Sequence, residues 1–430
     1  MAKIPVVIVG GGMITQMQIL PSIYQLQRLG AVGDIAVSAL NGAPLKVLDE
    51  DPLLRQAFPG QTFTPYPDFR KVGVSQNYPE LFKEVLAGLP GRSAVVVALP
   101  DQLHYGAVKE ALNAGHHVCC VKPLVLRHRQ AVEIEELAHG RGLLVGIEYH
   151  KRFYDRSLIA RRRYRAGLFG EFRLGQARLI EPWYYRHSNF QNWCTVENSD
   201  AFSYVGCHYT DLVTFITGLK PVSVSVYGIV EPWPNGKKGY LWTDGRVVFE
   251  NGACLGVQNG FGYPDVGPGG NTQGLRMHFN GKSDGGYLEH EDSFRGVKHS
   301  FIEKGKAPGD TYYNETNPDY FQMVEAGGGT LRPVGYGYRS LEFIVGQVNR
   351  LNEATAGLPD RSRLEKAQAI LRQLDDDGLM ATPRNSAYNE LVMEAGRLSI
   401  TSGGREAIIE YGENPRVRLR EPHEYARLVT

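Results

Sequence analysis

The first third of the chain alternates short apolar runs with segments of helical periodicity. Five runs have the length and apolar content of buried strands: residues 4–9, 35–40, 94–98, 118–121 and 143–147. Three segments between them place apolar side chains at helical spacing: residues 14–29, 105–114 and 131–137. Pro21 lies inside the first of these segments and is expected to kink it. This alternation predicts a parallel, doubly wound sheet with right-handed crossovers over residues 1–150.

The pattern changes after about residue 151. Residues 222–230 form a valine-rich strand, and two dipeptides are turn signals: Asn251-Gly252 and Asn280-Gly281. Three segments have helical periodicity: residues 152–166, 339–353 and 363–374. We therefore expect residues 151–430 to form an α+β domain with a large, mainly antiparallel open sheet. The fold class is α/β overall, and the last stretch, residues 391–430, shows no pattern that we can assign.

Composition and charge exclude several classes of protein. The 430 residues are 42% hydrophobic and 22% charged with a net charge of +1, so we expect a packed core and neither nucleic acid nor membrane as a partner. No apolar run approaches the roughly 18 residues of a membrane span, and no signal peptide is expected at the start. Five cysteines without C-x-x-C spacing argue against disulfides and against a metal site. We expect a cytoplasmic protein without a metal.

A glycine-rich turn separates the first predicted strand from the first predicted helix. Gly10, Gly12 and Thr15 form G-x-G-x-x-T, in which the first glycine permits a tight turn and the second lets a pyrophosphate approach the backbone. This context predicts a Rossmann dinucleotide site. Asn41 ends the second strand, where an acidic residue usually holds the ribose, and an amide does not repel a 2′-phosphate. No arginine follows closely, so we expect NAD, with NADP as the open alternative.

Four further features, in fixed order, extend this picture. They are VVIVGGGMIT, then VVVALPDQLHYGAVKEALNAGHHV, then CCVKPL with Lys122 and Pro123, then VGCHYTDLVTFITG with Gly206, His208 and Asp211. The ordered set resembles the Gfo/Idh/MocA family, which includes glucose–fructose oxidoreductase and inositol dehydrogenases. The motifs cover roughly residues 4 to 220.

The resemblance implies a Rossmann domain that holds the cofactor beside an acid/base pair. With the glycine turn, it assigns to the cofactor Gly10, Gly12, Met13, Ile14, Asn41, Leu99, Pro100, His104, Val121 and Lys122. It also implies that Lys122 and His208 handle the proton of a substrate hydroxyl while a hydride passes to the nicotinamide. Tyr204 lies four residues before His208, so on a helix the two share a face, and we expect Tyr204 to act as an auxiliary hydroxyl. Asp211, three residues after His208, would orient the imidazole.

Two positions depart from the family's pattern. Val121 stands where the family has a glutamate before the lysine, so the cofactor site lacks that carboxylate. Tyr204 stands where many of its dehydrogenases have an aspartate. A tyrosine can hydrogen-bond a sugar hydroxyl but cannot pair electrostatically with Lys122 at neutral pH. Asp200, four residues earlier, is a candidate substitute.

An aromatic segment, EPWYYRHSNFQNW, follows the predicted helix of the second domain. Aromatic rings stack on the C–H faces of sugars, although core packing or a subunit interface would use the same residues. Together with strand-end residues that the resemblance implies, the candidate substrate residues are Lys122, His150, Arg152, Trp183, Tyr185, Trp193 and Asp211.

These features favour an NAD(P)-dependent oxidoreductase that transfers a hydride between a sugar or polyol carbon and nicotinamide. One alternative is an NAD-dependent glycosidase that acts by transient oxidation and elimination. Another is a non-catalytic NAD-binding sensor or assembly protein, against which the retention of Lys122 and His208 argues. Because the predicted second sheet presents a broad face that needs covering, we expect a homodimer or homotetramer.

Overall fold

The computed structural model describes residues 3–267, 270–281, 285–291, 300–304, 311–315 and 319–425. The chain folds into two compact units. The first comprises Met1–Val125, Arg129–Phe153 and Pro318–Ala387. The second comprises Leu126–His128, Tyr154–Asn317 and Tyr388–Thr430. The sequence suggested one division after residue 150, whereas the first unit runs on to Phe153 and includes a later segment as well.

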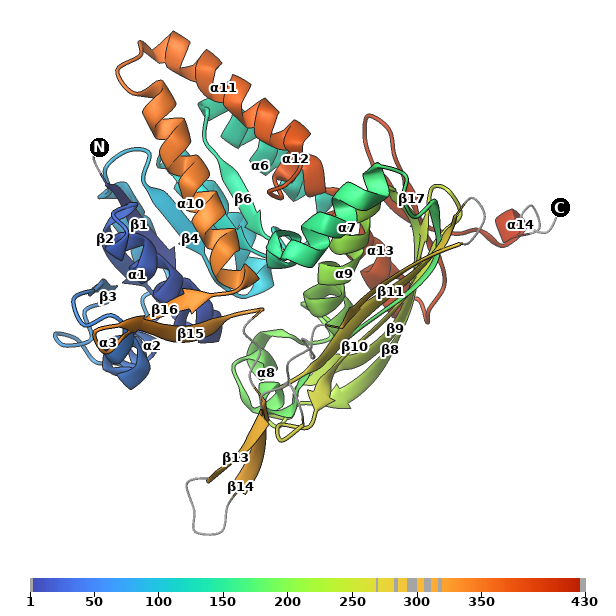
Figure 1. Cartoon of the computed structure of the whole chain (residues 1–430), viewed down its shortest axis with the longest axis horizontal. Helices are drawn as coiled ribbons and strands as arrows, with labels where there is room; N and C mark the ends of the chain where they lie inside the picture. The colour runs from blue at the N-terminus through green and yellow to red at the C-terminus, as the bar shows by residue number, and fades with distance from the viewer. Residues whose placement is uncertain are drawn as a thin grey trace. The chain divides into compact units, whose positions relative to one another are not determined.

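A six-stranded sheet forms the centre of the first unit (Figure 1). Its strands, in spatial order, are β3 (Thr64–Tyr66), β2 (Val32–Ser38), β1 (Ile4–Val9), β4 (Ala94–Val97), β5 (His117–Val121) and β6 (Val145–Glu148). Every neighbouring pair is parallel. The order 3-2-1-4-5-6 is that of a Rossmann fold, so the predicted doubly wound sheet is confirmed.

Helical segments follow these strands, and the three that the alternating pattern predicted, at residues 14–29, 105–114 and 131–137, are among them. They are η1 (Thr15–Ile19), α1 (Leu20–Arg28), α2 (Gly42–Glu50), α3 (Pro52–Ala57), α4 (Leu81–Ala87), η2 (Asp101–Leu103), α5 (His104–Asn113), α6 (His128–Arg141) and η3 (His150–Phe153). Pro21 lies in the first turn of α1, and the turn before it, η1, is a π-helix. A proline supplies no backbone N–H to the preceding turn, and the wider π turn accommodates this loss. The expected kink is therefore a local change of helix type.

The later segment of the first unit begins with a hairpin and continues as helices. Its elements are β15 (Gln322–Gly327), β16 (Thr330–Val334), α10 (Tyr336–Thr355), α11 (Asp360–Asp377) and α12 (Pro383–Ser386). Helix α10 packs against α1, η3 and the strands β5 and β6. The backbone N–H of Ile147 donates to the carbonyl of Ala381 over 2.9 Å, so this segment also borders the edge strand β6.

An eight-stranded sheet forms the second unit (Figure 1). Its strands, in spatial order, are β12 (Gly286–Glu291), β11 (Thr272–Asn280), β7 (Glu171–Pro182), β10 (Cys254–Tyr263), β9 (Lys238–Phe249), β8 (Pro221–Pro232), β17 (Ala407–Glu410) and β18 (Arg416–Leu419). Only the β7–β10 ladder among these is parallel, so the expected large, mainly antiparallel sheet is confirmed. A separate hairpin pairs β13 (Ser300–Lys304) with β14 (Thr311–Glu315).

The second unit also contains helices, several of which pack on its sheet. They are α7 (Asp155–Arg165), η4 (Trp183–His187), α8 (Phe190–Trp193), η5 (Phe202–Gly206), α9 (Cys207–Thr217), α13 (Tyr388–Thr401) and α14 (Pro422–Tyr425). Helix α13 lies along β8 and β17, and η5 lies on β9 and β10. The turn at Asn251-Gly252 is confirmed, because it joins β9 to β10 and Gly252 has a φ of 79°. None of the described helices is long and apolar enough to cross a membrane.

Candidate functional site

The glycine turn of the first unit has the geometry of a dinucleotide cradle. Gly10 has a φ of 119°, and a Cβ there would lie 2.0 Å from the carbonyl oxygen of Ala98 on the neighbouring strand. A Cβ on Gly12 would meet nothing within 4 Å, so this backbone borders open space. The Thr15 hydroxyl donates to the Gly10 carbonyl over 2.7 Å and ties the turn to the helix. The first glycine therefore serves packing, and the second leaves room for a pyrophosphate at the helix start.

Asn41, the predicted ribose contact, follows β2 and caps helix α2. Its side-chain oxygen accepts from the Ala43 N–H over 3.2 Å, and its amide donates to the Asn77 side-chain oxygen over 2.9 Å. The side chain is half-exposed at the carboxyl end of the strand, where a Rossmann fold places the ribose. Its place agrees with a cofactor contact, but its hydrogen bonds already serve the helix cap.

His104 joins the carboxyl ends of β4 and β5. Its ring nitrogens lie 2.7 Å from the carbonyl oxygen of Pro123 and 2.8 Å from that of Leu99. The ring is fully buried, and Lys122, directly before Pro123, is 9% exposed. His104 therefore holds together the loops that carry three predicted cofactor residues, Leu99, Pro100 and Lys122.

A buried polar network lies at the end of β6, beside the strand that leads to Lys122. Glu148, which is 2% exposed, accepts from Gln18 over 2.9 Å and from the Ser340 hydroxyl over 2.6 Å. Its second oxygen lies 3.1 Å from Nδ1 of His150. Sequence reasoning proposed His150 but missed its partners, because they come from η1, β6 and α10. Glu148, a carboxylate directly after the predicted strand at residues 143–147, was the feature of the sequence that could have indicated this network.

In the second unit, Tyr204 and His208 follow each other along one continuous helix. Tyr204 lies in the π-helical turn η5, and His208, 6% exposed, lies in the first turn of α9. Asp211 is 1% exposed and accepts from the Tyr388 hydroxyl over 2.8 Å and from the Asn389 amide over 2.9 Å. Asp211 thus links α9 to α13. These two partners were not predicted from the sequence.

The glycine of the G-x-H-x-x-D motif serves close packing. A Cβ on Gly206 would lie 2.6 Å from the side-chain oxygen of Asn259, a buried residue of β10. Asp200, the candidate substitute for the missing aspartate, is fully buried. It accepts from the Ser203 N–H over 2.7 Å and lies 3.5 Å from a guanidinium nitrogen of Arg397. Burial raises the pKa of this carboxyl, and its contacts make it a cap for η5.

The aromatic segment gathers around Tyr204. Phe190 lies 4.8 Å from the Tyr204 ring, Trp193 lies 5.7 Å from it, and Phe261 of β10 lies 6.1 Å from it, as centroid distances. Tyr185 stacks on Phe190 at 5.0 Å. The structure therefore brings together Tyr185, Trp193 and Tyr204, and adds Phe190 and Phe261, which the sequence did not single out.

Two further predicted substrate residues, Trp183 and Arg152, differ from each other in their exposure. Trp183 is 45% exposed, and the Arg186 guanidinium lies 4.3 Å from its ring centroid. Arg186 also pairs with Glu231 over 2.6 Å. Arg152 is 2% exposed in the first unit, with its guanidinium 5.9 Å from the Tyr149 ring. Trp183 is thus partly exposed, with Arg186 over its ring, whereas Arg152 is buried.

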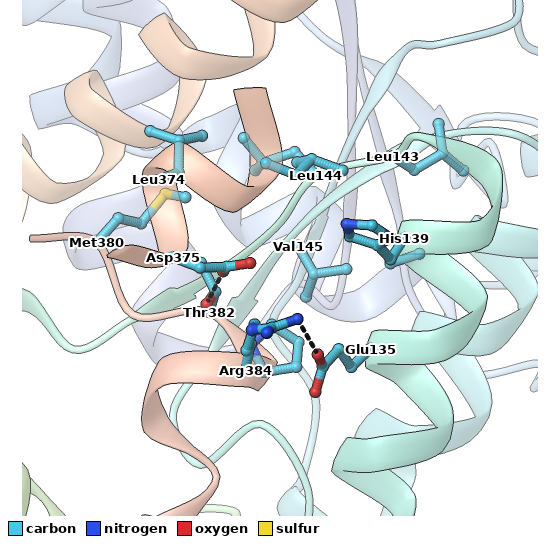
Figure 2. Close-up of a pocket in the computed structure, with 13 residues that line it drawn as sticks. Glu135, His139, Leu143, Leu144, Val145, Leu374, Asp375, Met380, Thr382 and Arg384 are labelled. Atoms are coloured by element: carbon cyan, nitrogen blue, oxygen red, sulfur yellow. Dashed lines mark hydrogen bonds and ion pairs between the residues drawn. The ribbon is translucent and has the colours of Figure 1, made fainter. Parts of the chain in front are cut away.

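A small pocket in the first unit lies away from all of these residues. It holds about 30 Å³ and is lined by α6, β6, α11 and α12, including His139, Asp375 and Arg384 (Figure 2). Burial lowers the pKa of His139 and raises that of Asp375. No predicted site residue lines it, so we do not place the active site there.

Comparison with known proteins finds a family model that is similar to the N-terminal part of the first unit. Residues 4–149 match the model of the oxidoreductase family with an NAD-binding Rossmann fold. D-glucoside 3-dehydrogenase of Escherichia coli is 25% identical over 39% of this chain and 51% of its own length. An uncharacterised oxidoreductase of Schizosaccharomyces pombe is 40% identical over 18% of this chain and 21% of its own length. The chain thus spans from a fifth to a half of the length of these relatives.

Solved structures of similar fold cover nearly the whole chain. Scyllo-inositol dehydrogenase from Lactobacillus casei, with NAD(H) and scyllo-inositol bound, has a TM-score of 0.57 at 15% identity and covers 94% of this chain and 99% of its own. Myo-inositol 2-dehydrogenase from Lactobacillus plantarum has a TM-score of 0.58 at 15% identity and covers 95% of this chain and 100% of its own. At these identities the likeness concerns the fold alone. The glycine cradle, the strand order and the matched model agree, so residues 4–149 form a Rossmann domain that is similar to the oxidoreductase family that the motifs indicated.

Proposed function

We propose that this protein is an NAD(P)-dependent oxidoreductase that oxidises or reduces a hydroxyl-bearing carbon of a sugar or polyol. The observation that carries the proposal is the open cradle at Gly12, on the same sheet edge as the buried Lys122. In parallel sheets, ligands bind outside the carboxyl ends of the strands. The named relatives that act on glucosides, and the fold neighbours that act on inositols, support the substrate class.

The residues that fit the cofactor are those of the cradle and of the strand ends. Gly10, Gly12, Met13 and Ile14 would face the pyrophosphate, Asn41 the ribose, and Leu99 to His104 the loop beside the nicotinamide. The bound nicotinamide supplies a hydride acceptor. We expect a preference for NAD of modest size, because Asn41 carries no charge that would exclude NADP.

Lys122 and His208 form the proposed proton-handling pair. A neutral lysine amine can take the proton of a substrate hydroxyl, and Lys122 is shielded from water by burial. His208 is the second acid/base residue of this pair, and the Tyr204 hydroxyl can hydrogen-bond the sugar and orient it. His150, Arg152, Tyr185, Trp183, Trp193 and Asp211 are the proposed substrate contacts or their supports.

The first test is calorimetric titration with NAD+ of the protein and of Gly12→Val. We expect the substitution to abolish binding, because its side chain would fill the space that borders the cradle. Unchanged affinity would contradict the assignment of the cofactor site. A panel of myo-inositol, scyllo-inositol, methyl β-D-glucoside and UDP-N-acetylglucosamine, followed at the NADH absorbance band, then tests the reaction. Release of an aglycone without net NADH would favour the redox-neutral glycosidase instead.

We also propose a homodimer or homotetramer in the cytoplasm. The outer face of the eight-stranded sheet carries exposed Tyr227, Ile229 and Tyr287, which a partner subunit would cover. All five cysteines are free thiols, as expected in a reducing compartment. Light scattering at micromolar concentration tests the assembly, and a monomer mass would contradict it.

A further inference from the structure

Glu148 and His150 form a buried carboxylate–imidazole pair on the strand next to the one that leads to Lys122. Val121 and Glu148 are register partners in the parallel β5–β6 ladder. Lys122 therefore leaves β5 at the same level at which the chain leaves β6 toward His150. Lys122 and His150 are each 9% exposed, and Glu148 is 2% exposed. A carboxylate and an imidazole thus lie at the sheet edge where the lysine lies.

The carboxylate of Glu148 is fixed by donors on both oxygens. Oε1 accepts from the Gln18 amide over 2.9 Å and from the Ser340 hydroxyl over 2.6 Å. Oε2 lies 3.1 Å from Nδ1 of His150. Gln18 is itself held by the Tyr320 hydroxyl over 2.6 Å. A carboxylate with these contacts is oriented toward the histidine and cannot rotate without losing several hydrogen bonds.

Two neighbouring aromatic rings pack against the imidazole of His150. The ring centroids of Tyr320 and Tyr336 each lie 5.3 Å from the His150 centroid. Lys151 also lies beside these rings, with its Nζ 3.4 Å from the Tyr336 hydroxyl. An ionised carboxylate can only accept, so this contact favours the tautomer that carries its hydrogen on Nδ1 and, in a neutral ring, its lone pair on Nε2.

Packing alone does not require such a network. A buried ion or polar group costs desolvation energy, and apolar side chains of similar volume often serve stability equally well. A carboxylate that fixes the tautomer of an imidazole is, in contrast, the arrangement that prepares a histidine to accept a proton. Because His150 lies at the same sheet edge as Lys122, a histidine held in this tautomer could accept a proton from the lysine.

We propose that His150 is a further acid/base residue of the reaction and that Glu148 is its positioning residue. The proposal rests on the proposed function, in which Lys122 takes the proton of the substrate hydroxyl. When bound, the nicotinamide would accept the C–H electron pair as hydride, while the O–H proton moves to the Lys122 amine as the carbonyl forms. The lysine then passes one proton to Nε2 of His150, and the resulting imidazolium is stabilised by the Glu148 carboxylate through Nδ1–H. The net change is the loss of a hydride and a proton from the alcohol.

Two variants and a matched control test the proposal. We expect His150→Gln to lower kcat by about 100-fold or more and Glu148→Gln by about 10-fold, with the NAD+ dissociation constant unchanged within about twofold. His139→Gln, a histidine of the same unit in the pocket of Figure 2, should leave kcat unchanged. The assay uses the compound of the sugar and inositol panel that yields NADH. A change in KM alone in His150→Gln, or a kcat within about threefold of the wild type, would overturn the proposal.

A measurement without substrate separates this proposal from the proposed function. Nitrogen NMR of 15N-histidine-labelled protein, with His150→Gln for assignment, reports the tautomer of His150. We expect the Nδ1–H form, converting toward the Nε2–H form in Glu148→Gln. If the Nε2–H form dominates in the wild type, the proposal fails even where NADH production stands. If the Nδ1–H form is found but no panel compound reduces NAD+, the conclusion that Glu148 sets the tautomer of His150 stands and the proposed function fails.

Discussion

The two units hold their candidate site residues by different physical means. In the first unit, Glu148 and His104 are fixed by hydrogen bonds of 2.6–3.1 Å to named donors and acceptors. In the second, Tyr204 is surrounded by aromatic rings at centroid distances of 4.8–6.1 Å. Hydrogen bonds are directional and lose much of their strength when bent, whereas ring contacts tolerate shifts.

This difference matches the tasks that we propose for the two units. A hydride acceptor and a proton acceptor must be placed within a few tenths of an ångström, which directional bonds achieve. A surface that receives a sugar ring needs shape and apolar area, which aromatic rings supply. The following substitutions test whether residues held by directional hydrogen bonds tolerate change less well than the aromatic contacts around Tyr204.

The largest effect is expected from the proton-handling residues. Lys122→Ala and His208→Ala should each lower the rate of hydride transfer by about 100- to 10,000-fold while NAD+ still binds, because a positioned acid or base is lost. Lys122→Arg should not restore the rate, since a guanidinium stays protonated. Single-turnover kinetics with the panel substrate measures this. Near wild-type rates in both alanine variants would remove the mechanism and favour the sensor function.

Substitutions at the two glycines of the turn should affect different properties, stability at Gly10 and NAD+ binding at Gly12. Gly10→Ala should lower the free energy of unfolding by about 3 kcal/mol or more, because its Cβ would collide with the Ala98 carbonyl and its φ is 119°. Gly12→Ala meets no atom within 4 Å and should change stability by less than about 1 kcal/mol while weakening NAD+ binding. Urea unfolding and calorimetry of both variants provide the comparison. Equal losses of stability would show that the two glycines do not have separate tasks.

Acid should destabilise the first unit through His117. Burial lowers the pKa of this fully buried ring to about 3, and it stays neutral with Nε2 bonded to Asn352 over 2.9 Å and Nδ1 accepting from the Leu144 N–H over 3.0 Å. Because the folded value lies below the unfolded one, its stabilisation is present above about pH 6.5 and is lost as the pH falls toward 3, by at most about 1.4 kcal/mol per unit.

His117→Gln should therefore flatten the dependence of unfolding free energy on pH between about 6.5 and 4. The exposed His187→Gln is the matched control and should leave the slope unchanged. Denaturant titrations at several pH values give the slopes. A wild-type slope in His117→Gln would mean that other groups govern the acid response.

The smallest effect is expected at Tyr204. Tyr204→Phe keeps the ring contacts with Phe190 and Trp193 and removes only the hydroxyl. We expect kcat/KM to fall by less than about tenfold, and by less than in Lys122→Ala, because the loss is one hydrogen bond. A loss as large as that of His208→Ala would make the hydroxyl an equal member of the acid/base set.

Several elements of both units followed from local patterns. The strand at residues 4–9, the glycine turn and the hairpin at Asn251-Gly252 were predicted where they occur, since apolar periodicity and glycine conformation are local properties. Strand β7 was missed, although it lies at the centre of the second sheet, because its outward positions are polar and its burial depends on neighbours. The return of residues 318–387 to the first unit was missed for the same reason.

The sequence by itself determined the fold class, the family motifs and the identity of Lys122 and His208 as candidates. Only the tertiary structure decided which side chains support them. Gln18 meets Glu148 across 130 residues, and Asp211 meets Tyr388 across 177. Such contacts depend on the order of strands in a sheet and on which helix returns to cover it. Spacing along the chain fixes a turn or a helix face, but it cannot fix a contact between segments that only the packed core brings together.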